Sequence, residues 1–221
     1  MKKYIKKVAV IISGCGNRDG GEIHETTLAL LELDKAGFEA VCFAPNKDQA
    51  DVIDFVTGKT MNEKRNVLQE SARIARGKIR DLKEFNSSEV DALVIPGGMG
   101  AAKNLCDFAL KGENCTVDKD VEKAILEMFK LHKPICAICI APVVVAKVLG
   151  KEKVKLTIGN DKETAEKIEK MGCIHENCEV QNACIDVKNK IISTPAYMLA
   201  KSISDVDAGI VDMIRKLEEI V

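Results

Sequence analysis

Short, continuous apolar runs alternate along this chain with longer stretches in which apolar residues recur every three or four positions. The short runs have the length and composition of buried parallel strands, and the longer stretches have the periodicity of amphipathic helices. Strands are predicted at residues 8–12, 39–44, 91–95, 134–138 and 154–158. Helices are predicted at residues 22–36, 62–75, 118–132, 163–171 and 199–219, and a further apolar helix follows Cys139. This alternation predicts an α/β fold, a single doubly wound flavodoxin-like sandwich with a mainly parallel central sheet and helices on both faces.

The last part of the chain departs from this alternation. Residues 179–187 and 191–194 flank the polar turn Lys188-Asn189-Lys190, which predicts an antiparallel hairpin. No internal repeat, low-complexity tract or linker interrupts the sequence. Because 221 residues are enough for one large core, residues 1–221 are predicted to form a single domain.

Net charge and aromatic content narrow the class of partner. Charged residues make up 30% of the chain and nearly cancel, which leaves a formal net charge of −1. No overall field therefore favours nucleic acid or an acidic membrane surface. Trp is absent and aromatic residues are only 4%, which argues against stacking platforms for carbohydrate or single-stranded nucleic acid. We expect a small-molecule partner, with no nucleic acid and no membrane.

The cysteines and the basic N-terminus bear on compartment and metal binding. Nine scattered cysteines, an odd number in a chain of this size, do not fit a secreted disulfide scaffold. Cys136 and Cys139 have the spacing of a zinc or redox pair, but no second Cys/His pair has the usual spacing, so no metal site is predicted. The apolar run 8–12 is too short for a signal peptide or a membrane span. The protein is therefore expected to be cytoplasmic and reduced.

Cys139 is the first candidate for chemistry because it falls on the turn between a buried strand and a helix. A side chain there lies at the carboxyl end of a parallel strand, where open α/β sheets place their sites. The N-terminus of the next helix offers free N–H groups and partial positive charge, which favour a cysteine pKa below its ordinary value of about 8.5. The alternative is a buried core thiol, which is our expectation for Cys136. The residue pattern alone leaves both interpretations of Cys139 open.

Glycines and glutamates follow two other predicted strands. The loop 13–21 lacks the third glycine of a dinucleotide fingerprint. Glu22 and Glu25 come next and share one helix face. They are either surface acids that complement the helix dipole or candidates to meet the thiol at the sheet edge. The turn Pro96-Gly97-Gly98 is either an ordinary turn or a cradle of backbone N–H groups for an oxyanion or phosphate.

The order and spacing of several motifs carry a family resemblance. The segments 22–26, 95–105 and 138–142 together resemble the PfpI superfamily, the class I glutamine-amidotransferase-like fold of small deglycases, glyoxalases and stress proteins. Further motifs resemble its ElbB branch, whose members are described as glyoxalases linked to isoprenoid biosynthesis. These motifs are Ser13-Gly14-Cys15-Gly16, Arg65-Asn66-Val67-Leu68, Cys139-Ile140-Ala141-Pro142, Leu156-Thr157-Ile158-Gly159 and Thr194-Pro195-Ala196-Tyr197-Met198. The likeness covers nearly the whole chain.

The resemblance implies a role for each matching residue. Cys139 matches the elbow nucleophile, and Glu25 matches the glutamate that hydrogen-bonds this thiol, with Glu22 a second candidate one turn away. Gly98 and Ile140 match the positions whose backbone N–H groups form the oxyanion hole. The further candidates for the substrate pocket are Cys15, Gly97, Asn66 and Thr194. Many hydrolytic members have His directly after the cysteine, where this chain has Ile140, so His24 and His175 remain as candidates for a third catalytic group.

The function implied is that of a cofactor-independent glyoxalase or deglycase. It would convert glyoxal or methylglyoxal, or their adducts, to hydroxyacids through a hemithioacetal on Cys139. No cofactor is expected, and a homodimer is expected because dimers are common in the superfamily. One alternative is a non-enzymatic oxidation sensor or holding chaperone in which Cys139 becomes a sulfinate. Another is a glutaminase-type amidohydrolase, a class that needs a late His-x-Glu pair, whose spacing His175-Glu176 lacks.

Overall fold

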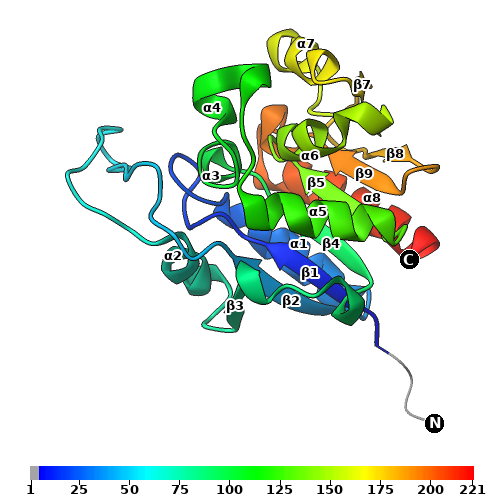
Figure 1. The fold of residues 1–221 in the computed structure, drawn as a ribbon, viewed down its shortest axis with the longest axis horizontal. Helices are drawn as coiled ribbons and strands as arrows, with labels where there is room; N and C mark the ends of the chain where they lie inside the picture. The colour runs from blue at the N-terminus through cyan, green and yellow to red at the C-terminus, as the bar shows by residue number, and fades with distance from the viewer. Residues whose placement is uncertain (1–4) are drawn as a thin grey trace.

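The computed structural model describes residues 5–221, and a seven-stranded sheet lies at its centre (Figure 1). The strand order is β3-β2-β1-β4-β5-β9-β8, and only the β8–β9 pair is antiparallel. The strands of this sheet are β1 (Lys7–Ile11), β2 (Glu39–Ala44), β3 (Ile79–Asp81), β4 (Ala92–Ile95), β5 (Ile135–Ile138), β8 (Cys184–Asp186) and β9 (Ile191–Thr194). A second, two-stranded parallel sheet consists of β6 (Lys155–Leu156) and β7 (Ile174–His175).

Helices cover both faces of the central sheet (Figure 1). The helices are α1 (Ile23–Lys35), α2 (Val67–Ile74), α3 (Met99–Lys103), α4 (Phe108–Lys111), α5 (Lys119–Lys130), α6 (Pro142–Leu149), α7 (Lys162–Lys170) and α8 (Ile203–Ile220). Along β1, Val8 and Val10 pack in one apolar cluster with α1 and α8, whereas Ala9 and Ile11 pack in the other with α5 and α6. Because successive side chains serve opposite covered faces, the strand sequences are apolar throughout rather than alternating.

The predicted α/β fold is confirmed, and its central strands lie close to the predicted positions. β2 spans the predicted residues 39–44, and β1, β4 and β5 each agree within one residue at either end. The predicted hairpin is also present, although β8 begins at Cys184 rather than at residue 179.

Several predicted boundaries are wrong for identifiable reasons. α2 begins at Val67 instead of residue 62, because the Asn66 side chain caps it by accepting the Gln69 N–H at 3.1 Å. α8 begins at Ile203 instead of residue 199, because Ser202 starts it with a capping box. The run 154–158 forms only the two-residue β6, which pairs with β7 outside the central sheet. The three-residue edge strand β3 was not predicted, since it is too short to show a period.

The strand order brings three loops to one edge of the sheet. β1, β4 and β5 are neighbours and run parallel, so the segments that follow Ile11, Ile95 and Ile138 leave the sheet at the same end. These segments contain the glutamates, the Gly97-Gly98 turn and Cys139 singled out from the sequence. Within residues 5–221, no helix is long and apolar enough to cross a membrane.

Candidate active site

Cys139 occupies a strained turn between β5 and α6. Its φ is +60°, in the left-handed region that non-glycine residues rarely adopt. The surrounding backbone holds this conformation: the Cys139 N–H donates to the Thr194 carbonyl at 2.9 Å, and the Ala141 N–H donates to the Ile138 carbonyl at 2.9 Å. The residue is 7% exposed. Strain of this kind persists only where the fold enforces it, and it is concentrated at functional positions.

The Gly97-Gly98 turn lies directly against the cysteine. A Cβ on Gly97 would lie 2.6 Å from the Cys139 Cβ and 2.6 Å from Glu25 Oε2, so only glycine allows this approach. Gly98 has φ +89°, and a Cβ there would lie 2.4 Å from the Glu22 backbone nitrogen. The backbone N–H groups of Gly98 and Ile140 donate hydrogen bonds to the Cys139 sulfur. The two predicted oxyanion donors therefore converge on one point.

Replacing Gly98 with alanine should lower the free energy of unfolding by about 3 kcal/mol or more, because the new methyl group meets backbone atoms that have no room to move. Gly77→Ala is a matched control. Gly77 also has a positive φ, +78°, but has no atom within 4 Å of its would-be Cβ, so its cost should be only the conformational one, about 1–2 kcal/mol. Urea denaturation of both variants tests this, and equal losses would show that the close approach does not require glycine.

Glu25 is completely buried beside the thiol. Its Oε2 accepts the Gly97 N–H at 3.0 Å, its Oε1 accepts the Tyr197 N–H at 3.3 Å, and its side chain is hydrogen-bonded to Cys139. Burial, reinforced by the charge of Glu22, raises the pKa of Glu25 to about 8. The carboxyl is therefore protonated at neutral pH.

The predicted lowering of the Cys139 pKa is wrong in this structure. Burial of the thiol, together with the charge of Glu25, raises the Cys139 pKa well above that of an ordinary cysteine. The N–H groups of Gly98 and Ile140 act in the opposite direction but do not outweigh burial. Both of these N–H groups lie outside α6, which begins only at Pro142. At neutral pH the Cys139–Glu25 pair is thus neutral, with a proton on each group.

Glu22 has a different place from Glu25. Its Oε2 accepts the Glu25 N–H at 2.7 Å, so the side chain caps α1. Its backbone N–H donates to the Gly97 carbonyl at 3.0 Å. Glu22 is therefore a helix-capping acid that also influences Glu25 through its charge, and Glu25 alone of the two is hydrogen-bonded to the thiol.

The other predicted pocket residues differ in how they relate to Cys139. The Thr194 carbonyl holds the Cys139 N–H, but its hydroxyl donates to the Asn182 carbonyl at 3.0 Å. The Asn66 side chain is occupied as the α2 cap and by a hydrogen bond to Asn46. Cys15 is half-buried, with its pKa raised by burial and by the charge of Glu70 on α2. Gly97 alone among these four candidates approaches the Cys139 side chain.

A cavity of about 540 Å³ lies beside Glu22 and Tyr197, whose N–H groups are bonded to Gly97 and Glu25. It is lined by Asn17, Glu22, Ile23, His24, Phe55 and Tyr197. None of the four predicted pocket candidates lines it, and Asn17, Phe55 and Tyr197 were not singled out from the sequence. Tyr197 is part of the Thr194–Met198 motif, and this motif was the only sequence feature that pointed to it. Phe55 lies in a polar loop without a recognisable motif.

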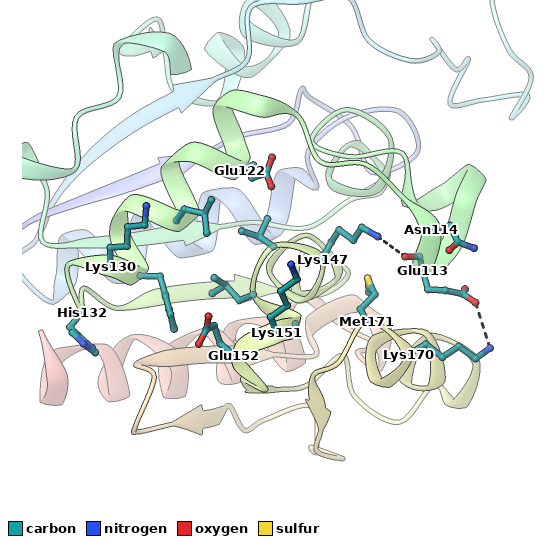
Figure 2. A pocket seen from close by; sticks show the side chains of 15 residues that line it. Glu113, Asn114, Glu122, Lys130, His132, Lys147, Lys151, Glu152, Lys170 and Met171 are labelled. Carbon is teal, nitrogen blue, oxygen red and sulfur yellow. Dashed lines mark hydrogen bonds and ion pairs between the residues drawn. The ribbon is translucent and has the colours of Figure 1, made fainter.

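A larger cavity of about 820 Å³ lies elsewhere, between α5, α6 and the end of α7 (Figure 2). Its rim is charged, and Lys147 donates to the Glu113 carbonyl at 2.9 Å while Lys170 pairs with the Glu113 carboxylate at 3.6 Å. Neither Cys139 nor Glu25 lines it. Cys139 and Glu25 do not line the smaller cavity either, but two of its lining residues are bonded to the elbow: the Glu22 N–H donates to the Gly97 carbonyl, and the Tyr197 N–H donates to Glu25. We therefore associate the candidate active site with the smaller cavity.

None of the three histidines of the chain, all within residues 5–221, is hydrogen-bonded to Cys139 or Glu25. His175 Nε2 accepts the Ile158 N–H at 3.3 Å, and burial lowers its pKa. Glu176 pairs with Lys155 at 2.8 Å. His24 lies in the smaller cavity, with Nδ1 2.7 Å from the Tyr197 hydroxyl. In the part of the chain that the structure describes, no cluster of three or more His, Cys, Asp or Glu could hold a metal ion.

A mostly parallel α/β sheet, with a cysteine on a strained strand-to-helix turn and a buried glutamate against its sulfur, places the chain in the DJ-1/ThiJ/PfpI fold class. Comparison with known proteins narrows the class. The chain is 45% identical over 224 residues to the human glutamine amidotransferase-like class 1 domain-containing protein 3, mitochondrial, covering 97% of this chain and 83% of that protein. It is 42% identical to the rat ES1 protein homolog, mitochondrial, covering 97% and 84%. The chain belongs to this family of glutamine amidotransferase-like class 1 domain and ES1 proteins.

Solved structures agree with this assignment. A crystal structure of an isoprenoid biosynthesis protein with an amidotransferase-like domain from Ehrlichia chaffeensis superposes with a TM-score of 0.91 at 41% identity, covering 97% of this chain and all of that one. A Schizosaccharomyces pombe DJ-1 mutant superposes with a TM-score of 0.58 at 17% identity over 98% of this chain and 92% of that one, which shows the shared fold alone. No family model matches the sequence.

These comparisons confirm the predicted PfpI-type resemblance and bear on the other expectations. The human and rat relatives are named as mitochondrial proteins, so the predicted cytoplasmic location is not supported. The single domain and the homodimer remain predictions.

Proposed function

We propose that this protein is a cofactor-independent glyoxalase or deglycase that acts on glyoxal, methylglyoxal or their adducts through Cys139. The observation that carries the proposal is the buried Cys139–Glu25 pair, with two backbone N–H groups directed at the sulfur. A thiol that adds to an aldehyde needs a nearby proton donor and acceptor and a place for developing negative charge on oxygen. The Glu25 carboxyl, as proton donor and acceptor, and the N–H groups of Gly98 and Ile140 meet these needs.

The proposed reaction needs no external oxidant or reductant. The Cys139 sulfur forms a bond to the aldehyde carbon, and the thiol proton goes to the aldehyde oxygen, giving a hemithioacetal. A proton then leaves this carbon, and another is added to the neighbouring carbonyl carbon. The first carbon is thereby oxidised to a thioester while the second is reduced to an alcohol. Water cleaves the thioester, which releases the hydroxyacid and restores the thiol. Glu25 is the group that takes and returns the carbon-bound proton.

The pKa of Glu25 sets the expected pH dependence. With that pKa at about 8, the pair holds two protons at neutral pH and loses the first as the pH rises through 8. Only the form that has lost one proton offers a base to the substrate. The value of kcat/KM should therefore rise about tenfold per pH unit up to about 8 and then level off. Initial rates between pH 6 and 9, corrected for the reaction without enzyme, measure this; a profile flat from pH 6 would contradict the assigned base.

The proposal is tested by product formation. The wild-type protein should convert glyoxal to glycolate and methylglyoxal to lactate without added thiol or metal, as measured by chromatography of the acids. Glycated thiols and amines as substrates distinguish deglycase from glyoxalase activity. A protein without turnover, in which peroxide adds mass only at Cys139, would instead indicate the oxidation sensor. The raised pKa of Cys139 disfavours that outcome, because peroxide reacts with the thiolate.

A further inference from the structure

The cavity of about 540 Å³ contains a pair of hydrogen-bonded groups that the reaction above does not use. The Nδ1 atom of His24 lies 2.7 Å from the Tyr197 hydroxyl, and the two tilted rings have centroids 5.9 Å apart. His24 is an exposed residue in the first turn of α1, and Tyr197 is a half-buried residue just after β9. Both side chains line the same cavity. The fold thus brings together two protic groups that are 173 positions apart in the sequence.

Tyr197 is tied to the Cys139–Glu25 pair through its own backbone. Its N–H donates to Glu25 Oε1 at 3.3 Å, and the carbonyl of Thr194, three residues earlier, accepts the Cys139 N–H at 2.9 Å. Glu22 lines the cavity next to Tyr197 and hydrogen-bonds through its own N–H to Gly97, which touches Cys139. The backbone of Tyr197 is therefore held directly by the carboxyl of the reactive pair, while its side chain lines the cavity.

The proposed reaction requires two separate proton movements. One proton moves from carbon to carbon, and another moves from oxygen to oxygen, since the ketone oxygen gains a proton that the aldehyde-derived oxygen loses. Glu25 can carry one proton at a time, and it carries the proton of the carbon step. Ile140, where many hydrolytic members have His, has a side chain with no exchangeable proton. A further protic group at the cavity is needed for the oxygen step.

We propose that Tyr197 is the acid/base residue that moves this proton between the substrate oxygens, and that His24 is the positioning residue that orients the phenol. This inference rests on the proposed function. The phenol gives its proton to the ketone oxygen as the ene-diol forms, and the phenolate takes the proton of the other hydroxyl as the thioester forms. The phenol thus ends the cycle in its starting state, and no other donor is consumed. With its proton on Nδ1, His24 donates to the phenol oxygen and leaves the phenol hydrogen free for substrate.

The electrostatic setting fits a proton donor. Burial and the charges of Glu22 and Glu25 raise the pKa of Tyr197, so the phenol keeps its proton at neutral pH. The hydrogen bond from His24 then stabilises the phenolate that forms during the reaction.

Tyr197→Phe is the direct test, because it removes the hydroxyl and keeps both the ring and the backbone N–H on Glu25. We expect kcat/KM for methylglyoxal to fall by about 10²–10³-fold. The rate at which iodoacetamide alkylates Cys139 should stay unchanged, since the Cys139–Glu25 pair keeps its contacts. Tyr4→Phe, the same substitution at the other of the two tyrosines, is the matched control and should leave kcat/KM unchanged.

Two variants of His24 test its positioning role. Asparagine places an amide nitrogen near the position of Nδ1, so His24→Asn should keep most of the activity, whereas His24→Ala should lose about tenfold, the equivalent of one hydrogen bond. Equal losses in both variants would overturn the positioning role.

The outcomes separate this inference from the proposed function. If the wild type is inactive, the proposed function and the role of Tyr197 are both overturned. If the wild type is active, Cys139→Ser is inactive and Tyr197→Phe retains full activity, only the role of Tyr197 is overturned. If Tyr197→Phe loses both turnover and Cys139 alkylation, the tyrosine is merely structural and the inference is likewise overturned.

Discussion

Replacing Cys139 with serine should abolish the conversion of methylglyoxal to lactate, with a loss of about 10³-fold or more. A serine hydroxyl ionises far less readily than a thiol, so the serine does not add to the aldehyde at a useful rate. The substitution should preserve the fold. The serine oxygen is smaller than sulfur, and the N–H groups of Gly98 and Ile140 and the Glu25 carboxyl remain as hydrogen-bond partners for it. Product formation and the urea midpoint, measured on the same sample, separate loss of chemistry from loss of structure.

Cys178→Ser is the matched control for this prediction. Cys178 is partly exposed, and its sulfur lies near the carbonyl of Glu179, with no contact to the elbow. We expect this variant to retain full turnover. Should Cys139→Ser retain activity while Cys178→Ser loses it, the elbow thiol is not the nucleophile.

The second large effect is expected from Glu25→Gln. Glutamine keeps a hydrogen-bond donor toward the sulfur but cannot take and return a proton, so turnover should fall by about 10²–10⁴-fold. Alkylation of Cys139 should instead become easier. Because the charge of Glu25 raises the Cys139 pKa, its removal should move alkylation to lower pH. Glu22→Gln, which alters only the helix cap and a neighbouring charge, should do much less; full turnover in Glu25→Gln would exclude the assigned proton carrier.

The same substitution should change the pH dependence of stability. Glu25 has a pKa of about 8 in the folded chain, against an ordinary value of 4.5, so between these pH values the unfolded chain has released a proton that the folded chain still holds. Unfolding therefore becomes more favourable as the pH rises through this window, by about 1.4 kcal/mol per pH unit for this one group. Below pH 4.5 the penalty is absent, because the carboxyl is protonated in both states. The penalty should disappear in Glu25→Gln.

Urea denaturation at several pH values from 5 to 8 measures this slope. Wild type and Glu22→Gln should lose stability with rising pH relative to Glu25→Gln. Parallel curves for all three proteins would show that Glu25 does not retain its proton in the folded state. If the Glu25→Gln protein is more stable than the wild type at pH 8, Glu25 is a residue that lowers the stability of the protein.

The sequence predicts the central sheet and the elbow well, because both have strong local signals. β1, β4 and β5 are continuous apolar runs that end in glycine or cysteine turns, and periodicity alone locates them. The short elements β3, β6 and β7 have no comparable signal, since two or three residues cannot show a period. Their positions depend on contacts that form only in the folded chain.

At the candidate site, the sequence singles out Cys139 and Glu25 but does not give the direction of the Cys139 pKa. The direction of the Cys139 pKa depends on how completely both groups are buried, and burial is a property of packing rather than of spacing. His24 was considered only as a lone histidine, because its partner Tyr197 is 173 positions away and nothing local links the two. Cys15 and Asn66 were predicted from family motifs, but Asn66 caps α2 and Cys15 lies near Glu70 of that helix. A motif alone does not distinguish a residue that stabilises the fold from one that contacts the substrate.

The position of β9 has a consequence for the order in which the protein becomes competent during synthesis. β9 lies beside β5 in the sheet, yet it is made after more than fifty further residues have been added to the chain. Its Thr194 carbonyl holds the Cys139 N–H, and Tyr197 just beyond it supplies the second N–H to Glu25. A nascent chain that ends before residue 191 contains both the cysteine and the glutamate but neither of these supports. The complete elbow, with both of these hydrogen bonds, can therefore form only after the last strand has left the ribosome.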